Sequence, residues 1–371
     1  MIQRIKNNIL FKNLQCFYTK IKYQLTNKKH VHTYPKLDFC KIEKGTKVLY
    51  IGTDELQDKS GFLQELEPFC DLKVFTKFDG GYGQYSEKQY LKGYGPDLNI
   101  DRLEMLLEDA NGRPEVILTQ SWARLWDIDK LKLLKQKYSF KFINICMDDR
   151  HSFYMMSVFR KYNRGTSGFI SLLDGALVTS KESIAWYHAK DIPALYFPEA
   201  TSSQFFNKLY IEKQYDVGFV GAKYGLRGEY IQYLIDNGIQ VKAYGNGWES
   251  GRIENEYVNS FFNKCKIVIG FGYILGCNDF MALKLRDFDV PATGSFYLTT
   301  YNEDLEELFP EKEGCYFTSK EEMLSKVRYY LANEEEREKI AYTSYVNTIE
   351  NHVYEERLKL IFKSENEKCN N

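Results

Sequence analysis

The feature that most constrains the fold of this chain is an alternation of short strand-like and longer helix-like segments, which begins at Lys47 and starts again at Tyr215. In the helix-like segments apolar residues recur at helical spacing, as Leu103, Leu106 and Leu107 do. Strands that alternate with helices predict a parallel sheet with helices on both faces, and hence an α/β fold. The strand-like segments are 47–53, 72–78, 115–121, 141–149, 175–180, 194–198, 215–221, 239–245, 266–272, 295–300 and 314–318, and 279–293 is among the expected helices.

The chain is long enough for two domains. Its 371 residues exceed the roughly 250–300 at which a single hydrophobic core stops growing. A polar stretch at 199–214 is interpreted as the connection between them. The expected division is a basic N-terminal segment at 1–40, Rossmann-like domains at 41–205 and 206–340, and a helical tail at 341–371. Two such domains facing each other enclose a cleft, and ligands bind beyond the carboxyl ends of the strands.

The composition, with 44% hydrophobic and 27% charged residues, is that of a globular protein. The net charge of −1 argues against a nucleic-acid-binding surface over the whole chain. The eight cysteines form no CxxC pair, so we expect buried free thiols in a reducing compartment and no metal site. The sequence has no apolar run of about 18 residues and no signal-peptide pattern at its start, so we expect a cytoplasmic protein.

The first segment is basic, and no acidic residue precedes Asp38. Its apolar residues fall close to one face of a helix. Such a helix can lie on an anionic membrane surface, which would make the protein peripheral to the membrane. The alternatives are a helix that packs on a domain or a partner, or a basic tail. The cations are Arg4, Lys6, Lys12, Lys20, Lys22, Lys28 and Lys29, and the apolar residues are Ile2, Ile5, Ile9, Leu14, Phe17, Ile21 and Leu25.

Several segments of the second half carry a resemblance to a known family. They are FVG (219–221) with Arg227, VKAYGNGW (241–248), LRDFDVPATGSFYLT (285–299), LEELF (305–309), SKEEMLSKVRYYLANEEEREKIA (319–341) and HVYEER (352–357). In order and spacing these segments resemble the GT-B glycosyltransferases, and within them the CgeB-like (spore-maturation-protein-like) branch of the group 1 glycosyltransferases. The first half is less similar and matches mainly at 50–57, 143–149 and 176–200.

The resemblance implies a GT-B fold and the transfer of a sugar from a nucleotide-sugar donor to a glycan, lipid-linked or protein acceptor. In this family the C-terminal domain holds most of the donor, usually without a bound metal. The nucleotide sugar is therefore the expected co-substrate, with no further cofactor and no nucleic-acid partner. Transfer with retention of the anomeric configuration would follow if the mechanism of the wider group holds.

The segment FDVPATG resembles the family pattern F-E-x-x-A-x-G. Asp289 takes the place of the glutamate that typically holds the ribose, and it is one methylene shorter; on its helical spacing alone it could equally face solvent. Arg286 matches a family arginine and would pair with a phosphate or with a nearby acid. Gly294 would permit either a close backbone approach to the ligand or a sharp turn. Asp287 has no counterpart in the pattern, so we expect a surface or ion-paired acid.

One departure from the wider group concerns its E-x7-E motif. The position of the first acid is occupied by Met281, so the motif is broken. Asp279, two residues earlier, could reach sugar hydroxyls or, with Asn278, cap the following helix, and the cap is the preferred interpretation. This departure weakens the expectation of a retaining mechanism.

Two further loops follow strands in the second half. Gly221, Lys223 and Arg227 stand where a strand meets a helix, and they would cradle a diphosphate unless the two cations are simply solvated. In the next loop, Asn246 forms part of a turn. Tyr244 or Trp248 could stack on the nucleotide base there. The complete set of expected donor-binding residues is Gly221, Lys223, Arg227, Tyr244, Asn246, Trp248, Asp279, Arg286, Asp289 and Gly294.

The candidate catalytic residues lie in the first half, after the strand at 141–149. Asp148, Asp149 and His151 would deprotonate or orient an acceptor hydroxyl, and the alternative for the two acids is a helix cap. Other readings of the whole chain are a non-catalytic nucleotide-sugar-binding or assembly protein and a sugar-nucleotide epimerase of the same fold. A periplasmic binding protein would need an export signal, which the sequence does not show.

Overall fold

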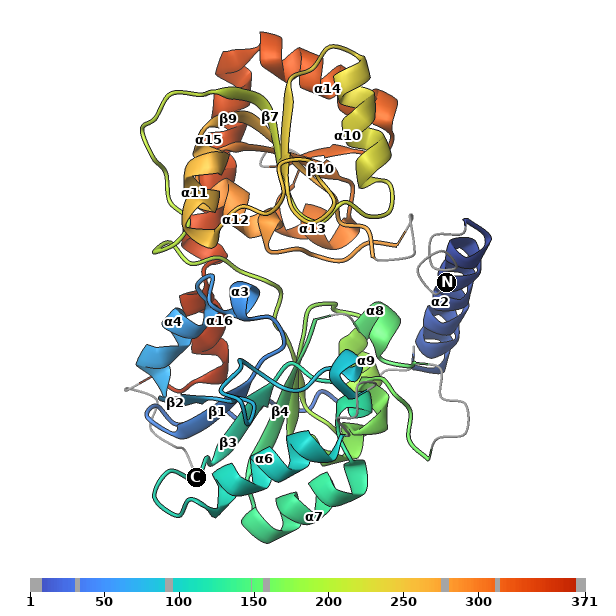
Figure 1. The fold of residues 1–371 in the computed structure, drawn as a ribbon, viewed down its shortest axis with the longest axis vertical. Helices are drawn as coiled ribbons and strands as arrows, with labels where there is room; N and C mark the ends of the chain where they lie inside the picture. The colour runs from blue at the N-terminus through green and yellow to red at the C-terminus, as the bar shows by residue number, and fades with distance from the viewer. Residues whose placement is uncertain are drawn as a thin grey trace. The chain divides into compact units, whose positions relative to one another are not determined.

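The computed structural model describes residues 9–30, 34–90, 96–147, 149–155, 161–274, 280–310 and 314–364. They form two compact units (Figure 1). The C-terminal unit comprises Glu199–Glu356 and the N-terminal residues up to Lys20, and the N-terminal unit comprises Ile21–Pro198 and the residues from Arg357 onward. The chain passes from the N-terminal unit to the C-terminal unit between residues 198 and 199. The sequence predicts this boundary between residues 205 and 206. The residues expected as a separate tail are shared between the units.

The N-terminal unit is built on a six-stranded sheet whose neighbouring strands are all parallel. The strand order is β2-β1-β3-β4-β5-β6, so β1 lies between the two strands that follow it in the chain. The strands are β1 (Lys47–Ile51), β2 (Asp71–Val74), β3 (Val116–Thr119), β4 (Lys141–Cys146), β5 (Gly175–Val178) and β6 (Ala194–Tyr196). Every residue of β3 and β5 is buried, as expected of strands covered on both faces.

The helices around this sheet are α3 (Glu55–Asp58), α4 (Phe62–Leu66), α5 (Glu87–Tyr90), α6 (Asp97–Glu108), α7 (Ile128–Tyr138), α8 (Asp149–Ser152) and α9 (Ser183–His188), with 3-10 turns at Glu67–Phe69, Ala123–Leu125, Thr166–Gly168 and Ile170–Leu172. Leu103 and Leu107 of α6 and Leu131 of α7 are fully buried in the main core of the unit. Asp127 caps α7 by accepting a hydrogen bond from the backbone N–H of Lys130. Helix α2 (Ile9–His30) is divided between the two units, because the boundary falls after Lys20.

The C-terminal unit contains a second parallel sheet, of five strands, in the order β11-β10-β9-β7-β8. Its strands are β7 (Tyr215–Val220), β8 (Val241–Tyr244), β9 (Cys265–Gly270), β10 (Phe296–Thr300) and β11 (Cys315–Phe317). The helices are α10 (Arg227–Asp236), α11 (Asn255–Asn263), α12 (Arg286–Ala292), α13 (Glu303–Leu308), α14 (Lys320–Ala332) and α15 (Glu334–Asn351), and α16 (Tyr354–Ile361) follows. The expected α/β class and the two parallel sheets are confirmed.

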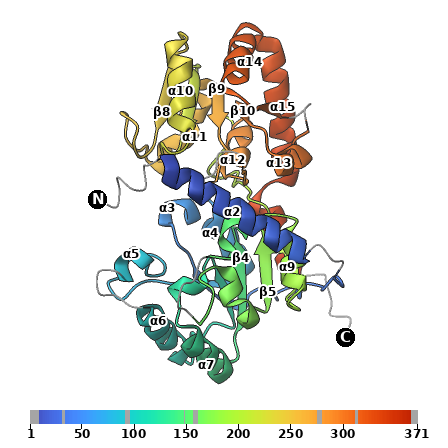
Figure 2. The same ribbon diagram turned by 90° about the vertical axis from the view of Figure 1, so that its right-hand side faces the viewer.

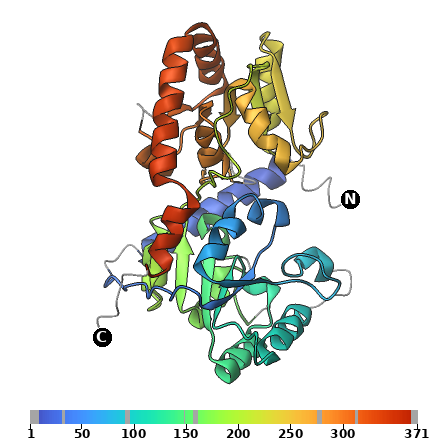
Figure 3. The same ribbon diagram turned by 90° about the vertical axis from the view of Figure 1, so that its left-hand side faces the viewer.

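Helices cover both faces of this second sheet (Figure 2 and Figure 3). On one face, side chains of α10 and α14 pack with Val217 and Phe219 of β7. On the other, Phe261 and Phe262 of α11 and Val290 of α12 pack against Val268 of β9. Strands β7, β9 and β10 therefore send alternate side chains into two separate cores, and this burial on both faces explains why their sequences are largely apolar.

The helix expected at 279–293 is shorter than predicted. Helix α12 begins only at Arg286, and Met281 instead forms an isolated antiparallel bridge with Tyr273. The residue before the helix, Leu285, offers no side-chain cap. Four of the expected free thiols are confirmed as buried, namely Cys70, Cys146, Cys265 and Cys315, whereas the free thiol of Cys40 is exposed.

Candidate functional site

The C-terminal unit has a topological switch point between β7 and β9. The chain leaves β7 for β8 on one side and then returns to β9 on the other, so the loops after β7 and β9 diverge at the carboxyl edge of the sheet. In open α/β sheets this is where ligands bind. The loop after β7 starts at Gly221, which has a φ of 152°. A Cβ added to Gly245, after β8, would lie 2.3 Å from the carbonyl oxygen of Gly221, so the two loops approach each other at a distance that requires glycine.

Arg227, the first residue of α10, spans this switch point. Its side chain is 3% exposed. Nη1 donates to the carbonyl oxygen of Ala222 at 3.0 Å, after β7, and Nη2 donates to that of Phe271 at 3.3 Å, after β9. The guanidinium group also lies over the Tyr224 ring, 3.9 Å from its centroid. Arg227 thus links the two diverging loops, while its Nε is buried and has no hydrogen-bond partner among the described residues.

Arg286, the first residue of α12, brings a second cation to the same point. A Cβ on Gly221 would lie 3.1 Å from Nη1 of Arg286 and 3.3 Å from Nη1 of Arg227. In Arg286, Nε and Nη2 are buried without a partner among the described residues. Burial, followed by the charge of Arg286, lowers the pKa of Arg227 to about 10. Two like charges with unsatisfied donors make this point of the sheet edge attractive to an anion.

The loop after β8 adds further polar groups next to Gly221. Trp248 donates from Nε1 to the carbonyl oxygen of Gly221 at 2.7 Å. The backbone N–H of Lys223 donates to the carbonyl oxygen of Asn246 at 2.8 Å, and its Nζ lies 4.9 Å from the centroid of a Trp248 ring. The structure thus brings Gly221, Lys223, Asn246 and Trp248 together. By contrast, the ring of Tyr244 packs edge-on against Phe261 at 5.0 Å, in the core formed with α11.

Asp289 lies in the first turn of α12 and is 7% exposed. Its Oδ1 accepts a hydrogen bond from the hydroxyl of Thr201 at 2.9 Å, and no described residue donates to its Oδ2. Burial raises the pKa of Asp289 well above its ordinary value, although the Thr201 hydrogen bond and the charge of Arg286 oppose the shift. One oxygen is therefore held in place, while the other accepts no hydrogen bond from the part of the chain that the structure describes. Its role as a ribose ligand stays a prediction.

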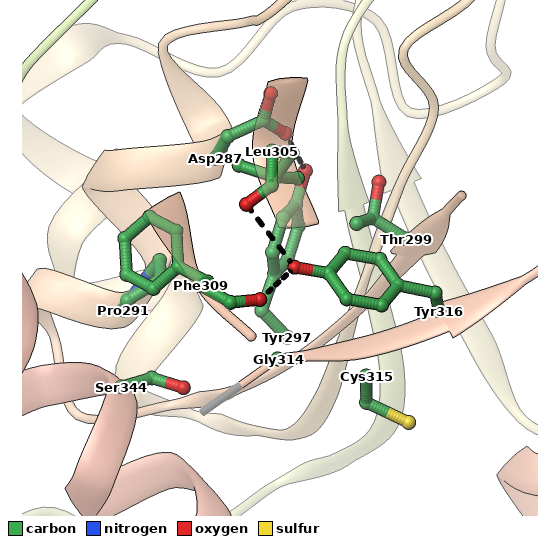
Figure 4. A pocket seen from close by; sticks show the side chains of 10 residues that line it. All are labelled: Asp287, Pro291, Tyr297, Thr299, Leu305, Phe309, Gly314, Cys315, Tyr316 and Ser344. Atoms are coloured by element: carbon green, nitrogen blue, oxygen red, sulfur yellow. Dashed lines mark hydrogen bonds between the residues drawn. The ribbon is translucent and has the colours of Figure 1, made fainter. Parts of the chain in front are cut away.

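The expectation of a surface or ion-paired acid at Asp287 is wrong, because Asp287 is buried and has no ion pair among the described residues. It is 2% exposed and accepts hydrogen bonds from the Tyr297 hydroxyl and the Lys284 backbone N–H, both at 2.7 Å. Burial raises the pKa of Asp287, and these two hydrogen bonds lower it in part. Figure 4 shows Asp287 and Tyr297 at a small hollow that is also lined by Phe309, Tyr316 and residues of α12, β10, α13, β11 and α15. Asp287 fixes the start of α12 to β10 and so holds Arg286 in position.

Gly294 is not brought to this site. It follows α12 with a φ of +67° and precedes β10, which starts at Phe296. Since all strands of the sheet are parallel, the start of β10 is at the opposite edge from Gly221. Of the two expected uses of Gly294, the structure shows the sharp turn. Asp279 lies outside the described residues.

The candidate catalytic residues of the N-terminal unit lie at α8. Asp149 is 2% exposed, and its two carboxylate oxygens lie 3.1 and 3.0 Å from the hydroxyl of Tyr187, which is also 3.0 Å from Sγ of Cys146. Burial raises the pKa of both Tyr187 and Cys146 well above their ordinary values, so the hydroxyl keeps the proton that it donates. His151 is half-buried in the same helix. Asp148 lies outside the described residues, and the catalytic role of the group stays a prediction.

Two residues with distinctive environments were not singled out from the sequence. Thr201, which holds Asp289, is separated from it by 88 positions, and no local pattern connects them. Asp58, in α3, accepts hydrogen bonds from the hydroxyls of Tyr50 at 3.0 Å and Tyr82 at 2.7 Å. Burial raises the pKa of Asp58 to about 6. Its sequence signal was weak, because acids are common in the first turn of a helix.

Among the described residues, His, Cys, Asp and Glu side chains form no group of three or more that could hold a metal ion. In the same part of the chain, no helix combines the length and hydropathy needed to cross a bilayer.

Comparison with known proteins bears on the C-terminal unit and on the fold. Residues 228–363 match a family described as glycosyl transferase-like. A comparison with curated proteins finds no match. This family segment contains α10 from its second residue onward, the strands β8 to β11, and α12. It therefore includes Arg286 and Asp289, whereas β7 and Arg227 lie before it.

Several solved structures are similar over most of the chain. Sucrose-phosphate synthase from Thermosynechococcus elongatus has a TM-score of 0.63 at 10% identity, with 84% of this chain and 96% of that chain covered. HepE of Anabaena in complex with UDP and glucose has a TM-score of 0.58 at 9% identity, with coverages of 85% and 98%. A putative UDP-N-acetylglucosamine 2-epimerase from Listeria monocytogenes has a TM-score of 0.51 at 10% identity, with coverages of 85% and 94%. At sequence identities this low, the similarity is evidence for a shared fold and not for a shared function. The chain has the GT-B fold, and its C-terminal unit carries a glycosyl transferase-like segment.

Proposed function

We propose that the protein is a glycosyltransferase whose C-terminal unit binds the diphosphate of a nucleotide-sugar donor at Gly221, between Arg227 and Arg286. The observation that carries the proposal is the approach of both guanidinium groups to this glycine at the switch point of the sheet. Three of their N–H-bearing nitrogens are buried without partners among the described residues. A diphosphate would satisfy those donors and separate two charges that otherwise repel each other.

The same arrangement suits the chemistry of sugar transfer. The bond between the anomeric carbon and the diphosphate oxygen breaks, and a new bond forms between that carbon and an acceptor oxygen. The negative charge that develops on the departing diphosphate would be stabilised by Arg227 and Arg286. These two charges also reduce the need for a metal ion at this step. The acceptor proton goes either to a base at Asp148, Asp149 or His151 or to the departing phosphate, and the second route is the one we associate with retention.

The remaining donor contacts are proposed from where Asp289 and Trp248 lie in the C-terminal unit. Oδ2 of Asp289 would accept hydrogen bonds from the ribose, and Trp248, beside Gly221, offers a ring for the base. HepE was solved with UDP and glucose, which supports UDP and UDP-glucose as the first ligands to try. The acceptor would be a glycan, a lipid-linked molecule or a protein.

A titration with UDP tests the donor site. We expect Arg286→Gln to weaken UDP binding by about tenfold or more, because charge-assisted hydrogen bonds are lost. A matched control is Arg328→Gln. Arg328 is an exposed arginine of α14 that bonds the carbonyl oxygen of Asn237, at the opposite end of α10 from Arg227. Equal UDP affinity in the two variants would contradict the proposed site.

A second function of the same fold, a non-catalytic nucleotide-sugar-binding or glycan-assembly protein, is favoured by one specific observation. The E-x7-E motif is broken at Met281, whose Sδ lies 3.9 Å from the Thr300 hydroxyl. Measurement of UDP release from UDP-sugars, with and without a panel of glycan and lipid-linked acceptors, separates the two. UDP binding without turnover across that panel would support the binding protein, whereas turnover that is lost in Arg286→Gln would support the enzyme.

A further inference from the structure

Helix α2 exposes the side of its surface that a helix of a globular protein normally buries. Its exposed side chains include a set of large apolar residues spaced three or four positions apart, so that they share one face. These side chains are exposed to between 37% and 63%: Leu14, Phe17, Ile21 and Leu25. We call this set the α2 stripe. An apolar stripe of this length in water normally marks a surface that is covered by something else.

The opposite side of α2 packs on the N-terminal unit through polar and aromatic groups. The ring of Tyr23 packs edge-on against Trp186 of α9 at 6.1 Å, and its hydroxyl donates to Oε1 of Glu182 at 3.2 Å. Thr26 is 5% exposed. Lys22 donates from Nζ to the carbonyl oxygen of Tyr154 at 3.3 Å. The polar side of the helix is therefore the side turned to the protein, which leaves the α2 stripe available to another surface.

The charge of the helix indicates what that surface is. Between Ile9 and His30 there is no acidic residue, and Lys28 and Lys29 are exposed at the end of the α2 stripe. The chain as a whole has a net charge of −1, so the excess of positive charge is local. A second copy of the same helix would bring lysines against lysines with no acid to pair them. An anionic lipid surface complements both features, since its acyl chains accept apolar side chains and its headgroups attract lysines.

We propose that α2 lies on an anionic lipid surface, with the α2 stripe inserted among the acyl chains and Lys28 and Lys29 at the headgroups. The helix would lie along the surface rather than cross it. This inference does not depend on the donor site.

One consequence rests on the proposed function. Glu182, which accepts from Tyr23 of α2, also accepts from Nε of Arg150 in α8 at 2.5 Å. Helix α8 also contains the acceptor-site candidates Asp149 and His151. A lipid-bound α2 would therefore place these residues close to the lipid surface, where the hydroxyl of a lipid-linked acceptor is found.

The experiment is co-sedimentation of the full chain with vesicles. One set of vesicles contains phosphatidylcholine and phosphatidylglycerol, and the other contains phosphatidylcholine alone. Phe17→Ser combined with Leu25→Ser removes two side chains of the α2 stripe, and Lys28→Gln combined with Lys29→Gln removes the charges. The control is Lys132→Gln combined with Leu133→Ser, which removes one exposed lysine and one apolar side chain that is 63% exposed on α7.

We expect binding to the anionic vesicles and much weaker binding to the neutral ones. Loss of each apolar side chain should weaken binding by about tenfold or more, and loss of each lysine by about fivefold. The control should bind like the wild type. All replaced side chains are solvent-exposed, so an unchanged thermal transition verifies that each variant is folded.

Three results would overturn the proposal. One is a wild-type chain that stays in the supernatant with anionic vesicles. Another is a Phe17→Ser, Leu25→Ser variant that still sediments like the wild type. The third is a wild type that forms a dimer without vesicles and loses it in the same variant, which would assign the α2 stripe to a second copy. A separate measurement of UDP affinity tests the donor site, so failure of the lipid-binding proposal can be distinguished from failure of the donor-site proposal.

Discussion

The guanidinium groups of Arg227 and Arg286 both lie against the ring of Phe219, with their Cζ atoms 5.6 and 5.4 Å from its centroid. They come from the first residues of two different helices, α10 and α12, and meet at the carboxyl end of β7. Without an anion this arrangement carries like-charge repulsion and unsatisfied donors. Because the empty site is energetically unfavourable, a mutation there should affect the stability of the empty protein and its ligand binding differently.

Arg286→Leu should leave the empty protein at least as stable as the wild type, because it removes repulsion with Arg227 and the two buried donors without partners. The same variant should lose the increase in melting temperature that UDP produces in the wild type, because ligand stabilisation requires binding. Thermal unfolding with and without UDP measures both effects. A variant that is strongly destabilised when empty, or that keeps the full UDP shift, would show that Arg286 has a structural role instead.

Donor affinity should fall at acidic pH as Asp289 becomes protonated, since only the carboxylate can accept both ribose hydroxyl hydrogens. The pKa of Asp289 is raised, so this loss should begin at a higher pH than for an ordinary aspartate. UDP-glucose is the suitable ligand, because its diphosphate does not titrate in this range. Calorimetry over a pH series should show a weaker and flatter profile for Asp289→Asn.

The control for that series is Asp236→Asn, at the exposed end of α10. It should reproduce the pH dependence of the wild type. A wild-type affinity that is independent of pH, or an unchanged affinity in Asp289→Asn, would remove Asp289 from the donor site.

Asp58 should make the stability of the N-terminal unit depend on pH. Its pKa rises from 3.8 to about 6 on folding, so the folded state binds a proton more tightly than the unfolded state. The free energy of unfolding contributed by Asp58 should therefore decrease as pH rises from about 3.8 to about 6, and stay constant above that. The shift corresponds to about 3 kcal/mol.

Asp58→Asn, which is neutral at every pH, tests this effect. Its free energy of unfolding relative to the wild type should increase over the same pH range, as measured by urea denaturation. Asp101→Asn, an exposed acid of α6, is the control and should change little. A difference between Asp58→Asn and wild type that is the same at pH 4 and pH 7 would argue against a raised pKa.

Gly245→Ala should be more damaging than Gly238→Ala, although both glycines have a positive φ. At Gly238, with a φ of +82°, a Cβ has no neighbour within 4 Å, so only the backbone penalty of about 1–2 kcal/mol is expected. At Gly245 the Cβ would also lie 2.3 Å from the carbonyl oxygen of Gly221. Denaturation of the two variants, together with their UDP affinities, provides the comparison. Equal stability and affinity would mean that the two loops can separate without consequence.

Much of the fold could be predicted from the sequence, because it depends on local patterns. Alternating apolar strands and periodic helices specify two parallel sheets with helices on both faces, and each element is encoded within its own residues. The position of Gly221 and Arg227 followed from the same pattern, since they stand where a strand meets a helix. The start of α12 was misplaced because residues from Asp279 to Leu285 include apolar residues whose spacing is compatible with a helix, while Met281 pairs with Tyr273 in the structure.

What the sequence alone determined, then, is the fold class, the succession of strands and helices along the chain, and the residues that share a face of a helix. What only the tertiary structure decided is which of those faces and side chains have partners. Asp287 is buried because Tyr297 reaches it, Asp289 is held by Thr201, and Gly294 lies at the opposite sheet edge from Gly221. The apolar residues of α2 likewise share a face, but its contacts with Trp186 and Tyr154 turn that face outward. These outcomes depend on contacts between distant segments, whose energies no local pattern contains.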